Sequence, residues 1–216
     1  VRISRHFDGG MEADPFDRVR PGDSMAQPQK TPRSRVTEAP GWRPGDSRAD
    51  VESMIRVDQA GEYGATRIYA GQLAVLGDAH PAARIISRMA FQEQRHLSRF
   101  DEIVGDRGVR PTLLQPFWNV AGHALGAATA LISPNAAMAC TAAVETEIDK
   151  HYEDQLRQLK DEDPELSETI AEFQAEELEH RDLALSHGAE STFGYPVLSA
   201  LIRAGCRAAI ALSKRI

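Results

Sequence analysis

The sequence EYGATRIYAGQL at residues 62–73 recurs in the second half of the chain as ETEIDKHYEDQL at residues 145–156. Both stretches follow the frame Glu-x6-Tyr-x2-Gln-Leu, and a recurrence of this kind indicates an internal structural repeat. Apolar residues at intervals of three and four run through both stretches and beyond them, which is the period of an amphipathic helix. The sequence therefore predicts two related units, each beginning with a long helix.

A second helix follows in each unit, starting near Pro81 in the first and Pro164 in the second. Breaks rich in glycine and proline separate the four helical stripes. Four long amphipathic helices with short connections are typical of a helix bundle. We therefore predict an all-α four-helix bundle built from a repeated helix pair, with two additional helices at about residues 115–132 and 195–214.

Six acidic or imidazole side chains occupy stripe positions where a bundle normally carries Leu or Ile. They are Glu62, Glu93, His96, Glu145, Glu177 and His180. Each of the two Glu-x-x-His pairs places a carboxylate and an imidazole on one helix face, because residues three apart are neighbours on a helix. The same alignment of the two halves relates all six, which argues against an accidental run of surface glutamates.

Four carboxylates at core positions are costly unless something compensates their charge. The facing stripe positions supply no Lys or Arg, whereas two divalent cations would balance the four negative charges. Oxygen ligands combined with imidazole suit iron or manganese better than structural zinc. One Glu from each of two helices and one Glu-x-x-His from each of two others is the ligand pattern of ferritin-like di-iron bundles, so we predict that fold and two iron ions per chain.

Three further glutamates lie close to these positions in the sequence. Glu176 precedes His180 by one helical turn and is an alternative partner for it, but the alignment of the two halves pairs Glu93 with Glu177 and so selects Glu177. Glu147 and Glu179 are expected to point elsewhere, as solvated acids or as outer partners of the site.

Residues 1–50 differ from the rest of the chain in composition. They hold six of the 12 prolines and show no apolar period, which predicts a disordered leader ahead of a helical domain at residues 51–216. The leader lacks the apolar run of a secretory signal and contains too many acids for a typical transit peptide. The net charge of −7 disfavours nucleic acid as a partner, and two cysteines favour a reducing compartment.

Two segments indicate contact with a membrane surface. No Asp, Glu, Lys or Arg occurs between Arg110 and Glu145, but the apolar run at 116–132 is short and interrupted for a spanning helix. The stretch after Glu190 contains four basic residues, no acid and an apolar face, which favours an anionic lipid surface. The alternative is that the last helix packs on the bundle with its basic face in water.

Five ordered motifs resemble the demethoxyubiquinone hydroxylase family over about residues 51–216. They are VDQAGEYGATRIYAGQL (57–73), EQRHL (93–97), AVETEIDKHYEDQL (143–156), EELEHRD (176–182) and AGCRAAIALS (204–213). The resemblance implies a ferritin-like di-iron monooxygenase of ubiquinone biosynthesis. Its implied reaction is hydroxylation by O2 of the benzoquinone ring of a polyprenylated demethoxyubiquinone intermediate.

The same resemblance implies roles for further groups. It places His151 and Tyr152 at a pair that passes electrons or protons between quinone and iron, and it implies NADH as the electron source. It also implies a peripheral membrane protein with a possible lipid-binding accessory partner. The absence of a transit peptide leads us to expect the cytoplasmic face of a bacterial cell membrane, with the matrix face of the mitochondrial inner membrane as the alternative.

Two other functions remain open at this stage. The bundle is also compatible with a di-iron oxygenase that has a different substrate, and with an iron-binding protein of the ferritin or rubrerythrin kind. A rubrerythrin is disfavoured because the chain has no cysteine pair for a rubredoxin-type site.

Overall fold

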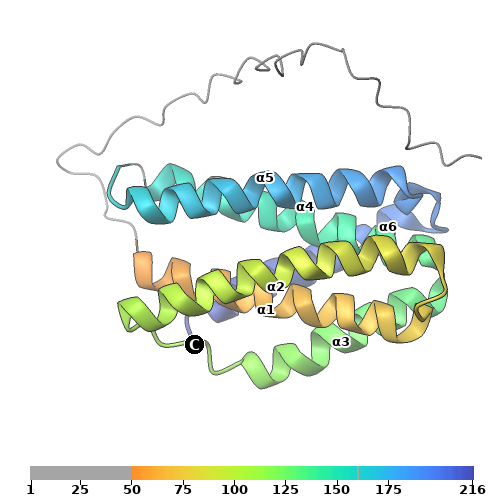
Figure 1. Cartoon of the computed structure of the whole chain (residues 1–216), viewed down its shortest axis with the longest axis horizontal. Coiled ribbons are helices and arrows are strands. Elements are labelled where there is room, and N and C mark those ends of the chain that lie inside the picture. Colours follow the sequence, from red (N-terminus) through yellow and green to blue (C-terminus); the bar gives the residue numbers. More distant parts are fainter. Residues whose placement is uncertain (1–49, 160) are drawn as a thin grey trace, which may run out of the picture. The chain divides into compact units, whose positions relative to one another are not determined.

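The computed structural model describes residues 50–159 and 161–216, and this part of the chain contains helices and no strand (Figure 1). The elements are α1 (Val51–Leu76), α2 (Pro81–Arg107), α3 (Gln115–Ile132), α4 (Pro134–Leu159), α5 (Pro164–Ser186), the short 3-10 helix η1 (Ala189–Ser191) and α6 (Tyr195–Ser213). The predicted all-α fold with four long and two additional helices is confirmed. Apart from Asp50, the predicted leader lies outside the described residues.

The helix boundaries follow local chemistry. The Asp50 carboxylate accepts a hydrogen bond from the backbone N–H of Ser53 at the start of α1, and Asp163 does the same for Leu166 in α5. These bonds satisfy N–H groups that have no partner within the helix. Gly108 directly follows the last residue of α2, and its φ of 63° is a left-handed conformation that glycine adopts without a steric penalty.

Helices α1 and α2 form one pair, α4 and α5 form the other, and α3 makes the connection between them (Figure 1). Besides a smaller apolar cluster that includes Cys140 and Ile202, two larger ones fill the bundle. One contains Phe100, Leu166 and Phe173, and the other contains Met89 and Met138.

Along each long helix, the predicted ligand positions fall between the residues of these two clusters. In α2, for example, Met89 belongs to one cluster and Phe100 to the other, with Glu93 and His96 between them. The sequence order in α1, α4 and α5 is equivalent. The fold therefore surrounds a polar layer with apolar packing along the bundle axis.

Helix α3 lies directly against the backbone of α1. A Cβ atom on Gly126 would stand 1.9 Å from the carbonyl oxygen of Ile68, and one on Gly71 would stand 2.1 Å from that of His123. Only glycine permits such an approach, because any side chain would overlap the neighbouring backbone. The apolar run therefore packs as a helix on the bundle, with many of its other side chains exposed.

Helix α6 is attached to α4 through Glu147. The carboxylate of this buried residue accepts a 2.6 Å hydrogen bond from Arg203 Nε and lies 3.2 Å from Arg207 Nη1. Both arginines offset the unfavourable effect of burial and lower the pKa of Glu147. The basic face of α6 is thus partly directed at the bundle, and Glu147 is neither a solvated acid nor a partner of the predicted metal site.

Replacing Gly126 by alanine is expected to destabilise the protein by about 1–3 kcal/mol, the usual cost of overpacking a close contact. The measurement is thermal unfolding followed by circular dichroism. The control is Gly105→Ala in α2, where nothing lies within 4 Å of the added Cβ. The control is expected to be neutral or stabilising, since alanine favours a helix more than glycine does. Equal melting temperatures for the two variants would contradict the close packing of α3 on α1.

Candidate metal centre

The structure brings together all six predicted ligand residues from four different helices. They are Glu62 of α1, Glu93 and His96 of α2, Glu145 of α4, and Glu177 and His180 of α5. Each is at most 2 % exposed. They form two overlapping groups whose donor atoms lie within 4.8 Å of one another, and both groups contain Glu93 and Glu177. This arrangement offers two adjacent cation positions with two shared carboxylates.

The first position has Glu62 and His96 as its own residues, and the second has Glu145 and His180. Both imidazoles direct Nδ1 into the cluster. His96 Nδ1 lies 3.0 Å from Glu177 Oε1, and His180 Nδ1 lies 3.0 Å from Glu93 Oε1.

Several of the oxygen and nitrogen atoms in the cluster that could bind a metal have no hydrogen-bond partner. They are Glu62 Oε2, both carboxylate oxygens of Glu93, His96 Nδ1, Glu145 Oε2 and Glu177 Oε1. An unsatisfied buried polar atom costs about 1–3 kcal/mol, so a cluster of six requires an explanation. Metal ions between the converging carboxylate and imidazole donors would satisfy all of them at once. The residues present therefore fit a pair of divalent cations, with a ligand chemistry that suits iron or manganese.

Two tyrosines orient the unshared glutamates across the repeat. The Tyr69 hydroxyl donates to Glu145 Oε1 at 2.9 Å, and the Tyr152 hydroxyl donates to Glu62 Oε1. Each tyrosine thus belongs to the opposite repeat from the glutamate that it holds. From sequence alone, Tyr69 resembles an ordinary core aromatic, and only the cross-repeat packing of α1 and α4 reveals this bond.

His151 lies beside Tyr152 but outside the ligand cluster. Its Nε2 is 3.1 Å from Asp58 Oδ1, and the same oxygen accepts a 2.7 Å hydrogen bond from Gln155 Nε2. Sequence reasoning missed Asp58, although this acid precedes Glu62 by one helical turn on the same face. Burial raises the pKa of Asp58 despite these two partners.

Without metal, the electrostatics of the cluster are strongly perturbed. Burial raises the pKa values of Glu93 and Glu145 well above the ordinary value, and the neighbouring carboxylate of Glu177 adds to the shift. Burial alone would also raise the pKa of Glu177, but the two imidazoles outweigh it and lower the value to about 2. Burial alone would lower the pKa values of the two histidines, but the carboxylates raise the pKa of His96 to about 11 and that of His180 to about 9.

Glu176 lies outside the cluster and does not face His180. Its carboxylate contacts the outer nitrogen of His96, with Oε2 2.7 Å from Nε2, and it is also paired with Arg95. Glu179 is exposed. The structure thus places Glu177, which the alignment of the two halves selects, in the cluster and Glu176 outside it, whereas the partner of Glu176 lies on another helix and was not predicted.

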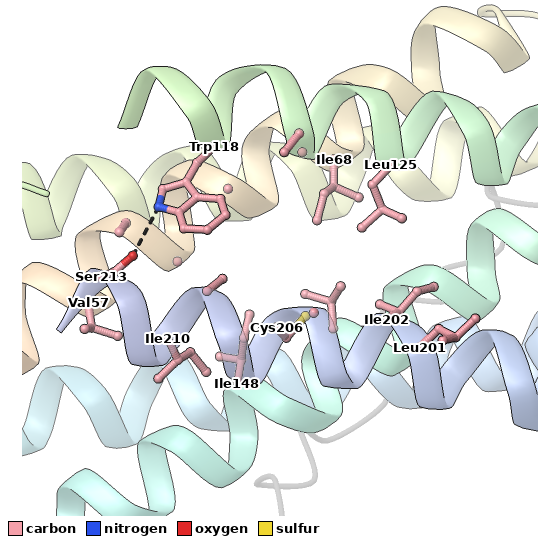
Figure 2. A pocket seen from close by; sticks show the side chains of 18 of the residues that line it. Val57, Ile68, Trp118, Leu125, Ile148, Leu201, Ile202, Cys206, Ile210 and Ser213 are labelled. Atoms are coloured by element: carbon pink, nitrogen blue, oxygen red, sulfur yellow. Dashed lines mark hydrogen bonds between the residues drawn. The ribbon is translucent and has the colours of Figure 1, made fainter. Parts of the chain in front are cut away.

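An apolar cavity of about 450 Å³ lies between α3 and α6 and against α1 and α4 (Figure 2). Its wall includes Gly61 and Val144, which directly precede Glu62 and Glu145. The rest of the lining is almost entirely aliphatic, as the labelled side chains show (Figure 2). At one end, Trp118 Nε1 donates to Ser213 Oγ at 3.1 Å and joins α3 to the end of α6.

The chain is similar to a group of known proteins over most of its length. The family described as "Ubiquinone biosynthesis protein COQ7" matches residues 49–213. The "3-demethoxyubiquinol 3-hydroxylase" of Rhodospirillum rubrum is 51 % identical over 175 residues, which are 80 % of this chain and 82 % of that protein. The human "NADPH-dependent 3-demethoxyubiquinone 3-hydroxylase, mitochondrial" is 53 % identical over 174 residues, 79 % of this chain and 80 % of its own length. The "5-demethoxyubiquinone hydroxylase, mitochondrial" of Saccharomyces cerevisiae is 42 % identical over 184 residues, 78 % and 79 % of the two chains.

The metal-free protein is expected to lose stability as the pH rises from about 6.5 to 9. When folding raises the pKa of a histidine, the histidine stabilises the folded state at any pH below its pKa in the unfolded chain. That contribution is lost as the pH rises through its pKa in the folded protein. His180 titrates at about 9, and the raised pKa values of Glu93 and Glu145 act in the same direction above about 4.5.

The measurement is urea unfolding of the chelator-treated protein across this pH range. The control is the same protein with ferrous iron, for which a much flatter profile is expected because bound metal replaces the protons. Metal-free stability that increases towards pH 9 would contradict the assigned shifts.

Proposed function

This chain belongs to the ubiquinone biosynthesis protein COQ7 family, and we propose that it hydroxylates the quinone ring of a polyprenylated demethoxyubiquinone intermediate, using O2 and a pair of iron ions. The observation that carries the proposal is a buried cluster of four carboxylates and two imidazoles, two of whose helices also line an apolar cavity that suits a lipid-like substrate. The names of the relatives supply the reaction.

The six cluster residues would hold the iron ions. Glu62 and His96 would bind one ion, Glu145 and His180 the other, and Glu93 and Glu177 both. When bound, ferrous iron supplies the electrons and open coordination sites that activate O2. The hydrogen bonds of the two tyrosines hold the unshared glutamates in place, and the surrounding apolar packing excludes water from the cluster.

The cavity suits a quinone with a polyprenyl chain. Its aliphatic lining offers no charged group, so it favours an apolar ligand, and it reaches the residues that precede Glu62 and Glu145. A ring placed at this inner wall would lie next to the metal cluster, while the chain would extend between α3 and α6.

We propose His151 and Tyr152 as the residues that pass protons or electrons between the quinone and the cluster. Neither lines the cavity, but Ile148 on the same helix does, and Tyr152 is hydrogen-bonded to Glu62. The rings of His151 and Tyr152 have centroids 6.2 Å apart. Asp58 holds the imidazole of His151 and so limits its orientation.

A reduced nicotinamide nucleotide is the proposed electron source. The family resemblance implies NADH, whereas the name of the human relative specifies NADPH.

We further propose that α3 and α6 rest on a membrane surface, with residues 51–216 as the working domain and residues 1–50 as a separate leader. Large exposed apolar side chains gather on these two helices and the loop before α6. They are Phe117, Val120, Leu131, Ile132, Phe193, Val197, Leu201 and Leu212. Helix α6 is long and apolar enough to cross a membrane, with a mean hydropathy of 1.3, but its pairing with Glu147 favours an interfacial position.

The same surface would receive the substrate and any lipid-binding accessory protein. The human and yeast relatives are named as mitochondrial. For this chain we propose peripheral association at the cytoplasmic face of a bacterial cell membrane, with the mitochondrial matrix face as the alternative.

Removing a cluster residue is expected to abolish the metal pair. Purified protein should contain about two iron ions per chain, and Glu145→Ala or His180→Ala should lower the content to one or less and reduce hydroxylation by at least about 100-fold, because these residues have no substitute in the buried cluster. The measurements are metal analysis and conversion of a demethoxyquinone. The control is Glu179→Ala, which alters an exposed residue on the helix that carries His180. Full activity in a metal-free preparation would overturn the proposed function.

Filling the cavity is expected to slow the reaction with a prenylated substrate. Ala209→Leu adds volume at a lining position, while Ala208→Leu makes the same change at the exposed neighbouring residue. A loss of about 1–3 kcal/mol of binding, about 10- to 200-fold in kcat/KM, is expected for the first variant only. Steady-state kinetics with long-chain and chain-free quinones provides the measurement. Equal effects on both quinones would argue against a prenyl site.

A further inference from the structure

The internal repeat places two different residues in equivalent positions behind the histidines of the cluster. Gln92 directly precedes Glu93, and Glu176 directly precedes Glu177. Each reaches the histidine on the other Glu-x-x-His helix. Gln92 Oε1 lies 3.1 Å from His180 Nε2, and Glu176 Oε2 lies 2.7 Å from His96 Nε2. The geometry is repeated, but one acceptor is a neutral amide and the other is a carboxylate.

The difference between the two acceptors affects metal binding because of the orientation of the two imidazole rings. Both direct Nδ1 into the cluster, so the outer Nε2 is free to carry the proton and donate it to its partner. A hydrogen bond to a carboxylate is stronger than one to an amide and makes the imidazole a stronger electron donor at its other nitrogen. His96 is therefore the more basic ligand of the two.

The neighbouring Arg95 stabilises Glu176 in its ionised form, so that the partner of His96 remains a carboxylate. Arg95 is paired with the carboxylate of Glu176 and also contacts Glu172 at 3.2 Å. The position equivalent to Arg95 in the other half is Glu179, so the sequence does not repeat this cation. The ring of His96 is additionally stacked on Phe173 at a centroid distance of 4.0 Å.

A second difference falls on the same side of the cluster. Near Glu62 and Tyr152, the buried acid Asp58 contacts His151 and Gln155. The residues equivalent to Asp58 and His151 near Glu145 are Thr141 and Ile68, so this acid and imidazole are not repeated. Both departures from the repeat thus lie next to the first position, which contains Glu62 and His96.

We propose that the two metal positions are inequivalent, and that Glu176 is a positioning residue that makes the first position the tighter site for ferrous iron. The inference rests on the proposed iron pair and assigns an order to it. A difference of about 10-fold in dissociation constant is expected, the lower end of the range for removing an outer partner of a metal-bound histidine.

The test is an anaerobic titration of the metal-free chain of residues 1–216 with ferrous iron enriched in ⁵⁷Fe, followed by calorimetry and Mössbauer spectroscopy. The unaltered protein should fill in two steps, with one quadrupole doublet dominating at one equivalent of iron. Glu176→Gln, which has nearly the same shape, should weaken the first step by about 10-fold and give two doublets together. Glu172→Gln is the matched control, because it removes a contact of Arg95 without touching His96.

The double variant Gln92→Glu/Glu176→Gln should restore two steps with the order of filling reversed. Site identity is read by adding Glu62→Ala or Glu145→Ala, which remove the unshared glutamate of the first or second position. In the natural background, Glu145→Ala should retain the tighter ion. In the double variant, Glu62→Ala should retain it.

The outcomes separate this inference from the proposed function. Two iron ions that bind with equal affinity, unchanged by Glu176→Gln, would overturn the inequivalence and leave the di-iron proposal standing. An equal effect of Glu176→Gln and Glu172→Gln would show that Glu176 acts only through Arg95 and would overturn its positioning role. A natural chain that binds no iron would overturn both proposals.

Discussion

Four carboxylates buried within a few ångströms of one another are the constraint on which the rest of this structure depends. In the absence of a cation they repel one another, several of their oxygens have no hydrogen-bond partner, and the pKa values of Glu93, Glu145 and Glu177 are shifted from the ordinary value. The apolar clusters on both sides of the carboxylates, which include Phe100 and Met89, exclude the water that would otherwise hydrate them. The bundle is therefore arranged for metal rather than for its own maximal stability.

The internal repeat builds the cluster from two related helix pairs. Each helix pair contributes one unshared glutamate and one Glu-x-x-His, and each pair also contributes a tyrosine that holds the glutamate of the other. Departures from the repeat are then informative. Glu176 opposite Gln92, and Asp58 opposite Thr141, lie around one cation position only. On the outside, α3 and α6 enclose an apolar cavity against α1 and α4, the two helices that carry Glu62 and Glu145.

Much of this could be predicted from the sequence because periodicity and internal repetition can be read along the chain itself. The helices and the six cluster residues emerge from a stripe with spacings of three and four that recurs in the second half of the chain. Contacts between helices are not local. Glu147 looked like a solvated acid, yet it is buried beneath α6 by Arg203 and Arg207. Tyr69 looked like a core aromatic, yet its hydroxyl holds Glu145.

The sequence by itself determined which residues are helical, which face of each helix is buried and which polar side chains lie on that face, since these follow from the regular period of the helix. The tertiary structure alone decided which side chain meets which across the bundle. It directs Glu176 to His96 rather than to His180, sets Asp58 against His151, and brings the glycines of α3 onto α1. The physical reason is that these partners depend on the relative rotation and spacing of packed helices, which the packing of all their side chains sets together.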